Sequence, residues 1–221
     1  MKTKAMPRLS DTEFYPTPPD LAVALVDWGV AQIRALPYGA IGSRLPAVLE
    51  PSAGLGAIAR EMGSVLGELR GLRIEPGVLA VEPNEPMPRI PNVCRRQTTL
   101  EAWVQTEEAQ RSEPLFVFGN PPFTLVEEHL RLLLDLPRPV CVTFLTRQSF
   151  LSTGGRIDGI LSTGELQSTC DLTPRPSFLE SERSGSNTDK HEVCLSFWSN
   201  RNHVARAPRD FIRWRASKKA K

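Results

Sequence analysis

The chain has 221 residues, 40% of them apolar, which favours one sizeable hydrophobic core over two independent ones. Its net charge of +2 conceals an asymmetry, because residues 201–221 hold eight Lys and Arg against one Asp, a net charge of +7 that leaves −5 for residues 1–200. No run of about 18 apolar residues occurs and the N-terminal residues continue into polar sequence, so we expect neither a membrane-spanning helix nor a secretory signal, and a cytoplasmic protein.

Strands and helices alternate along the predicted domain, which covers residues 1–200. The Thr-Pro-Pro run at 17–19 predicts a first helix of about 18 residues, with Thr17 as its cap and both prolines in the first turn, where amide hydrogens are not needed. A short buried strand is predicted at 47–49, followed by a glycine turn and a helix with an apolar stripe. Further strands are predicted at 78–81, 115–118, 140–145, about 168–172 and 192–198, with a helix near 125–134. This alternation predicts an α/β fold, with a mostly parallel sheet and helices on both faces.

The cysteines indicate neither a metal centre nor a disulfide scaffold. They are widely spaced and form no Cys-x-x-Cys pair. Three of them, Cys141, Cys170 and Cys194, lie in predicted strands. We therefore expect reduced cysteines in the core and no metal site.

The first informative segment is the glycine turn at 48–56, which reads Val-Leu-Glu-Pro-Ser-Ala-Gly-Leu-Gly. Glycine is expected at positions 54 and 56 because the backbone must approach a ligand closely there and a Cβ would intrude. Amides at the start of the next helix would then face the ligand. The turn also matches a dinucleotide fingerprint loosely, with Glu82 lying 26 residues after Gly56, so the turn alone leaves NAD open.

The second informative segment is the apolar run at 115–119, which ends in Asn-Pro-Pro-Phe, 70 residues after the acid of the first segment. An exocyclic amine on a base is a poor nucleophile because its lone pair is delocalised into the ring, so an enzyme must supply acceptors for the amine protons. The side-chain oxygen of Asn120 and the carbonyl of Pro121 can both accept. Pro122 stiffens the turn, and Phe123 offers a face on which an extruded base can stack. Taken alone, the tetrapeptide would be only a turn that ends a strand.

The order and separation of these two segments resemble the class I S-adenosylmethionine (SAM) methyltransferases that modify exocyclic amino groups. The resemblance covers residues 14–198 and is nearest to adenine N6 DNA methyltransferases of the small phage or prophage type. It implies the Rossmann-like class I SAM-methyltransferase fold, SAM as cofactor, and a nucleic acid as partner, DNA more than RNA. The motif Glu-Pro-Ser-Ala-Gly-x-Gly at residues 50–56 favours SAM over NAD.

The resemblance also implies roles for individual residues. Glu50 would lie near the methionine amino group of SAM, Glu82 would accept hydrogen bonds from the ribose hydroxyls, and Pro83 would flank the adenine ring. For Glu82 the alternative is an exposed carboxylate at a strand end. The implied catalytic residues are Asn120, Pro121, Pro122 and Phe123, and the implied cofactor-binding residues are Phe14, Tyr15, Pro16, Thr17, Glu50, Pro51, Ser52, Ala53, Gly54, Gly56, Glu82, Pro83 and Asn120.

Substrate contacts are predicted in the second half of the chain. Residues 173–178 and the polar stretch after them look like a loop of the small family members that faces the nucleic acid. Arg147 and Arg175 lie beyond predicted strand ends, where either could contact a phosphate or anchor a loop carboxylate. The basic tail at 201–221 holds Phe211 and Trp214, and either contacts phosphates or is solvated. The predicted substrate-binding residues are Phe123, Arg147, Arg175 and Phe178.

The chain departs from the family at residues 95–101, where an acid usually lies near the adenine amino group of SAM. Gln97 or Thr98 could accept that hydrogen bond, or the affinity for SAM is reduced. The chain also lacks room for a large target-recognition domain. The leading hypothesis is a DNA adenine N6-methyltransferase. The alternatives are methylation of RNA adenine or of protein glutamine, and a SAM-fold subunit that binds nucleic acid without catalysis.

Overall fold

The computed structural model describes residues 16–37, 40, 46–65, 78–83, 88–176, 192–201 and 209–213. Its helices are α1 (Pro19–Ala35), α2 (Ala57–Val65), α3 (Leu100–Trp103), α4 (Val126–Leu134) and α5 (Gly154–Ile157), with the 3-10 helices η2 (Gln148–Ser152) and η3 (Ile160–Thr163). Its strands are β1 (Ala47–Pro51), β2 (Val78–Val81), β3 (Val93–Arg96), β4 (Leu115–Gly119), β5 (Val140–Arg147), β6 (Leu166–Thr173), β7 (Val193–Ser199) and β8 (Arg209–Arg213).

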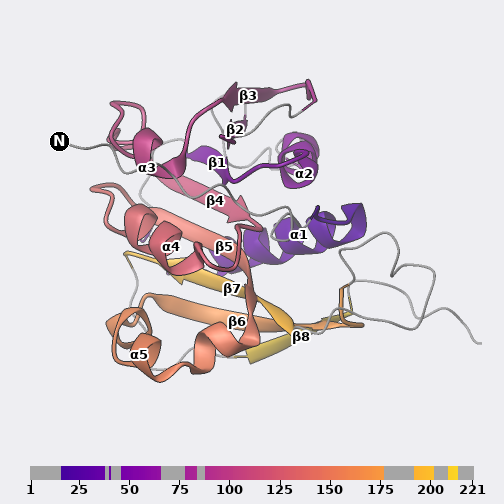
Figure 1. Ribbon diagram of the computed structural model, residues 1–221, viewed down its shortest axis with the longest axis vertical. Coiled ribbons are helices and arrows are strands. Elements are labelled where there is room, and N and C mark those ends of the chain that lie inside the picture. The colour runs from indigo at the N-terminus through magenta and orange to yellow at the C-terminus, as the bar shows by residue number, and fades with distance from the viewer. Residues whose placement is uncertain are drawn as a thin grey trace, which may run out of the picture.

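The described strands form one sheet in the order β3-β2-β1-β4-β5-β7-β6-β8 (Figure 1). Strand β7 runs antiparallel to its neighbours β5 and β6, and every other adjacent pair is parallel. The central strand β4 reads Leu-Phe-Val-Phe-Gly and is buried along its whole length. A continuous apolar run is typical of a parallel strand that is covered on both faces, because neither set of alternating side chains meets water.

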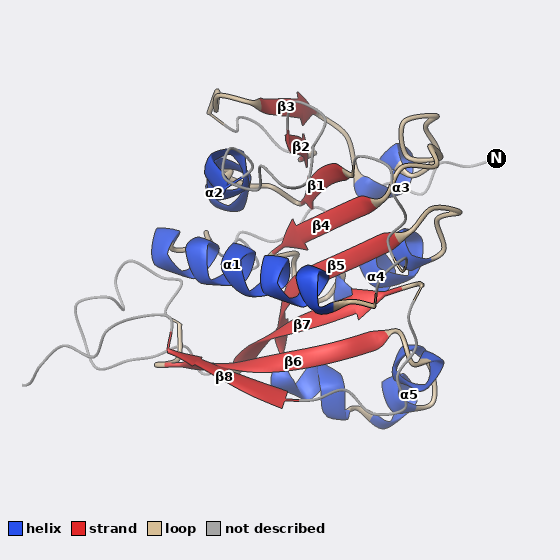
Figure 2. Cartoon of the chain, turned by 180° about the vertical axis from the view of Figure 1, so that it is seen from behind, coloured by secondary structure: helices blue, strands red, loops and turns tan. Residues whose placement is uncertain are grey.

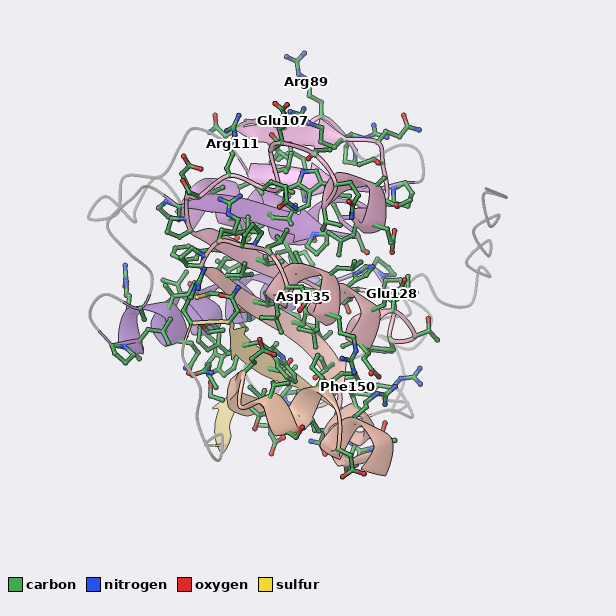
Figure 3. All side chains as sticks on the ribbon, turned by 90° about the vertical axis from the view of Figure 1, so that its left-hand side faces the viewer. Arg89, Glu107, Arg111, Glu128, Asp135 and Phe150 are labelled. Atoms are coloured by element: carbon green, nitrogen blue, oxygen red, sulfur yellow. The ribbon has the colours of Figure 1, made fainter. Side chains whose placement is uncertain are left out.

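Helices cover both faces of this sheet, with α1 and α2 on one side and α3, α4 and α5 on the other (Figure 2). The first face buries Leu25 and Met62 against the strands, and the second buries Leu130. Figure 3 views the molecule from the left-hand side of Figure 1 and labels Phe150 of η2, which packs edge to face on Trp198 of β7 with ring centroids 6.4 Å apart. The predicted α/β fold with a mostly parallel sheet is therefore confirmed.

The predicted cap of the first helix is wrong. Helix α1 is capped by Pro18, whose carbonyl accepts hydrogen bonds from the amides of Leu21 and Ala22 at 3.0 and 2.9 Å. Thr17 lies one residue before the cap, and no side chain caps the helix. Pro19 in the first turn has no amide hydrogen to satisfy, as predicted. The hydroxyl of Thr17 is thus available for another contact.

Several short elements were not among those predicted, namely β3, α3, η2, α5, η3 and β8. Strand β3 has four residues and alternates between half-buried and exposed positions, and α3 is one turn long, with the Thr99 hydroxyl accepting from the amide of Ala102 at 3.2 Å. Strand β8 lies within the predicted tail at 201–221 and pairs in parallel with β6. Residues 209–213 of that tail therefore belong to the sheet.

Two other expectations concern the core and the membrane. Cys141, Cys170 and Cys194 are buried in strands, as predicted. In the part of the chain that the structure describes, none of the helices is both long enough and apolar enough to cross a membrane.

Candidate active site

Two chain segments meet at one edge of the sheet because β1 and β4 are adjacent and parallel. From β1 the chain builds outward through β2 to β3, whereas β4 and β5 lie on the other side of β1, so the direction of strand addition reverses between β1 and β4. Ligands of open α/β sheets bind outside the carboxyl ends of the strands at such a reversal. The glycine turn follows β1, and Asn-Pro-Pro-Phe follows β4. The fold therefore brings the two predicted segments together.

The turn after β1 needs glycine for its backbone conformation. Gly54 and Gly56 have φ values of 52° and 74°, in the left-handed region that residues with a Cβ adopt at a cost. Ser52 has a φ of 61° without being glycine, a local strain of the kind that gathers at functional sites. The amide of Ala53 donates to the carbonyl of Val81 at 3.1 Å, which ties the turn to β2.

Two buried carboxyl groups flank this turn. Glu82 is 7% exposed, and its Oε2 accepts from the amide of Gly54 at 2.7 Å. The alternative of an exposed strand-end carboxylate is therefore wrong for Glu82, because the side chain holds the turn. Glu50 is 2% exposed, and its Oε2 accepts from the amide of Ala59, near the start of α2, at 2.6 Å.

The environment of Glu50 favours its neutral form. Burial raises its pKa well above the ordinary value, and the negative charge of Glu82 adds to the rise, while the hydrogen bond from Ala59 opposes it. No ion pair to Glu50 occurs among the described residues. A cationic group bound at this edge would supply the missing partner, because a buried carboxylate is stable only when its charge is matched.

Asn120 is held by Thr17, a residue near the start of the described chain. Its Nδ2 donates to the hydroxyl of Thr17 at 3.1 Å, across 103 residues of sequence. Pro121 is buried, and the carbonyl of Pro122 accepts from the amide of Leu125 at 2.8 Å, which closes the turn just before α4. The amide of Asn120 is thus held by Thr17, and the turn that follows it is closed just before α4.

Phe123 is brought together with Arg147. The guanidinium carbon of Arg147 lies 4.6 Å from the centre of the Phe123 ring, a cation–π contact. Arg147 is the last residue of β5 and does not lie beyond it. Its Nε is buried and has no hydrogen-bond partner in the described structure. The predicted stacking residue and one predicted substrate contact therefore form a single unit.

Arg175 makes the contact expected of an anchor. It forms an ion pair with Glu192, and both side chains are about half exposed. Nearby, the Nε2 of Gln148 donates to Asp171 at 2.9 Å, which ties the end of β5 to β6. Of the two interpretations of Arg175, the structure shows the one in which it holds a loop carboxylate.

The remaining predicted residues divide into three groups. Pro83 follows Glu82 and is half-buried, and Pro16 precedes Thr17. Gln97 is exposed and Thr98 half-buried beyond β3, where the amide of Thr98 donates to the carbonyl of Arg96 at 3.0 Å. Phe14, Tyr15 and Phe178 lie outside the described residues.

Sequence reasoning missed two features of the site. One is the strained backbone of Ser52, for which the flanking glycines were an indirect signal. The other is the pair of long-range contacts, Thr17 with Asn120 and Phe123 with Arg147. Local periodicity carries no signal for such contacts, because they depend on how separate elements pack.

Comparison with known proteins gives matches among solved structures alone. No family model and no curated protein matches the sequence. One similar structure is a protein from Listeria monocytogenes, itself provisionally assigned to the class I SAM-dependent methyltransferases. It is 11% identical with a TM-score of 0.58, and the match covers 93% of this chain and 68% of that one. Another is DrdV in complex with DNA, 12% identical with a TM-score of 0.54, and the match covers 91% of this chain and 28% of that one. The chain has the Rossmann-like fold of the class I SAM-dependent methyltransferases.

Proposed function

We propose that this protein is a SAM-dependent methyltransferase that acts on an exocyclic amine of a nucleic-acid base, with adenine N6 in DNA as the first candidate. One observation carries the proposal. Asn120, with its amide held by Thr17, follows β4 directly beside the turn that is flanked by two buried carboxyl groups after β1. A site for an amine and a site for a charged cofactor thus share one edge of the sheet.

The residues after β1 and β2 fit SAM. Glu50 is a buried carboxyl group without an ion pair among the described residues, which suits the ammonium group of the methionine part. Glu82, oriented by the amide of Gly54, can accept from ribose hydroxyls, and Pro83 can lie along the adenine ring. When bound, SAM supplies an electrophilic methyl group on a cationic sulfur.

The residues after β4 fit an amine on a planar base. The Oδ1 of Asn120 and the carbonyl of Pro121 would accept from the two amine hydrogens and so localise the nitrogen lone pair. Phe123 would stack on the base, which requires that the base leave its helix. Arg147 already lies over that ring and would favour a substrate with nearby negative charge.

A nucleic-acid substrate is supported by the direction of β8. Because β8 is parallel to β6, with Thr173 opposite Arg213, the chain leaves β8 at the edge where β4 ends. Residues 214–221 follow, with Trp214 and four Lys or Arg. Their basic side chains would neutralise backbone phosphates of a nucleic acid bound along this edge.

The test is methyl transfer from labelled SAM to DNA, RNA and a protein extract, each digested and resolved by product. We expect N6-methyladenine from DNA. N4-methylcytosine would mean that the site acts on cytosine and not on adenine. Methylated RNA or glutamine would mean that the substrate is RNA or protein. SAM binding without any product would favour the silent subunit instead.

A binding measurement separates cofactor from chemistry. SAM or S-adenosylhomocysteine should raise the melting temperature, because a ligand that binds only the folded state stabilises it. Glu82→Ala should weaken that shift. An equal shift in the Glu82→Ala variant, or tighter binding of NAD than of SAM, would contradict the cofactor assignment.

A further inference from the structure

Thr17 contacts the predicted amine acceptor directly. It is half-buried, lies just before α1, and takes no part in capping that helix. Its hydroxyl oxygen instead accepts from the Nδ2 of Asn120 at 3.1 Å. The two residues are 103 positions apart, so the bond joins the segment before the first helix to the end of the fourth strand.

This bond determines whether the oxygen or the nitrogen of the Asn120 amide faces the substrate. A primary amide carries its NH₂ and its oxygen on opposite branches of one plane, and its terminal torsion has a broad, roughly two-fold preference. Rotated by half a turn, Asn120 would present two donors to an amine that also donates. Because Nδ2 donates to Thr17, Oδ1 points to the opposite side, which is the orientation that an amine needs.

The position of Thr17 is fixed by how α1 packs. The carbonyl of Pro18 caps the helix, and Gly29 lets the helix lie directly on the sheet, where an added Cβ would come within 2.7 Å of Phe118. Phe118 is in β4, the same strand that leads to Asn120. Thr17 and Asn120 therefore belong to one packed unit, and the bond between them does not depend on a separate loop.

We propose that Thr17 is a positioning residue, whose hydroxyl holds the acceptor oxygen of Asn120 toward the reacting amine. The inference rests on the proposed function and gives Thr17 a role other than contact with the cofactor. A positioning residue affects the chemical step, whereas a cofactor contact affects the affinity for SAM, so the two roles have different kinetic signatures.

The first test compares Thr17→Val with Thr17→Ser. Valine keeps the shape of threonine but cannot accept a hydrogen bond, whereas serine keeps the hydroxyl. We expect Thr17→Val to lower the single-turnover rate of adenine methylation about tenfold, the size of one hydrogen bond, with SAM affinity changed less than about twofold. Thr17→Ser should restore the rate. Thr17→Ala gives the same readouts if valine prevents folding.

The second test is a double-mutant cycle with Asn120→Ala, measured both in the methylation rate and in equilibrium unfolding without cofactor. If Thr17 acts through Asn120, then Thr17→Val has almost no further effect in the Asn120→Ala background in either measurement. Additive effects, or a loss of SAM affinity as large as the loss of rate, would overturn the positioning role.

The activity of the wild type separates a failure of this proposal from a failure of the function on which it rests. An active wild type whose Thr17→Val variant is equally active overturns the positioning role alone. A wild type that methylates no amine overturns the proposed function, and the catalytic meaning of the bond with it, even if the unfolding cycle still reports coupling between Thr17 and Asn120.

Discussion

At the scale of one residue, Glu50 shows how a buried carboxyl group without an ion pair among the described residues affects stability. Its side chain is buried beside Glu82, and burial raises its pKa well above the ordinary value. A group whose pKa is raised on folding binds its proton more tightly in the folded state. Its favourable contribution to stability is complete below the unfolded pKa, near 4.3, and is lost as the pH rises through the raised value.

Glu50→Gln should therefore stabilise the protein without cofactor at pH 8 and leave its stability unchanged near pH 4. Glutamine can still accept the hydrogen bond from Ala59 but carries no charge to desolvate. SAM affinity should fall, because the proposed partner of its ammonium group is lost. Urea unfolding over a pH series measures the first effect, and calorimetry the second.

Glu127→Gln is the matched control for the pH series. Hydrogen bonds from Arg131 and Arg156 lower the pKa of Glu127, so its contribution has the opposite sign: it is present above the unfolded pKa and is lost as the pH falls. That variant should be less stable at pH 8, by a small amount because these side chains are partly exposed. A Glu50→Gln variant that is as destabilised as the control would contradict this account of Glu50.

At this scale the sequence could predict which residues lie at strand ends, but not their partners. Glu82, Asn120 and Phe123 follow apolar runs, so their position at the edge of the sheet follows from the order of strands. The bond from Asn120 to Thr17 and the stacking of Arg147 on Phe123 depend on how α1 and β5 pack beside β4. Such packing has no local signature in the sequence.

Helix α1 shows at the scale of an element how close packing overrides helix propensity. A Cβ added to Gly29 would lie 2.4 Å from the Oγ1 of Thr143 and 2.7 Å from the Phe118 ring. Alanine in a helix is more favourable than glycine by about 1 kcal/mol. Overpacking a well-packed core costs about 1–3 kcal/mol or more, and the contact atoms here belong to two buried residues.

We therefore expect Gly29→Ala to lower the free energy of unfolding, by up to roughly 2 kcal/mol after the gain in propensity of about 1 kcal/mol is subtracted from the packing cost. Gly155→Ala is the control, because that glycine lies in α5 and an added Cβ meets nothing within 4 Å. Denaturant midpoints for both variants measure the effect. The packing argument fails if Gly29→Ala is as stable as Gly155→Ala.

Long buried elements could be predicted from the sequence, and short exposed ones could not. Strands β4 and β5 appear as apolar runs because both of their faces are covered. Strand β3 has only four residues, half of them exposed, and α3 is a single turn, so neither gives a periodic signal. Strand β8 lies in a basic segment, and its charged residues give no apolar run that would predict a strand.

At the scale of the whole molecule, the direction of β8 guides the choice of truncation. Deletion of the last ten residues would remove Ile212 and Arg213, which pair with Leu172 and Thr173 of β6. Deletion of residues 214–221 leaves β8 complete and removes Arg215, Lys218, Lys219, Lys221 and Trp214. The shorter deletion tests the charge of the segment without disturbing the sheet.

We expect the protein without residues 214–221 to bind DNA less tightly at low salt, with a shallower dependence of log affinity on log salt. The slope should fall by about 0.9 for every backbone phosphate that the shortened protein no longer neutralises. SAM affinity should not change. Substituting the three lysines of this segment with glutamine, while keeping Trp214, separates charge from stacking. An unchanged salt slope would assign the segment to solubility.

The central claim, amine methylation at the end of β4, is tested most directly by single-turnover transfer from SAM to duplex DNA, with the methylated nucleoside identified. We expect the wild type to form N6-methyladenine and Asn120→Ala to form it about a hundredfold more slowly or worse, since an acceptor needed as charge develops on the amine is gone. SAM binding should be nearly intact in that variant. Equal rates for the wild type and Asn120→Ala, or no methylated base from the wild type, would contradict the account.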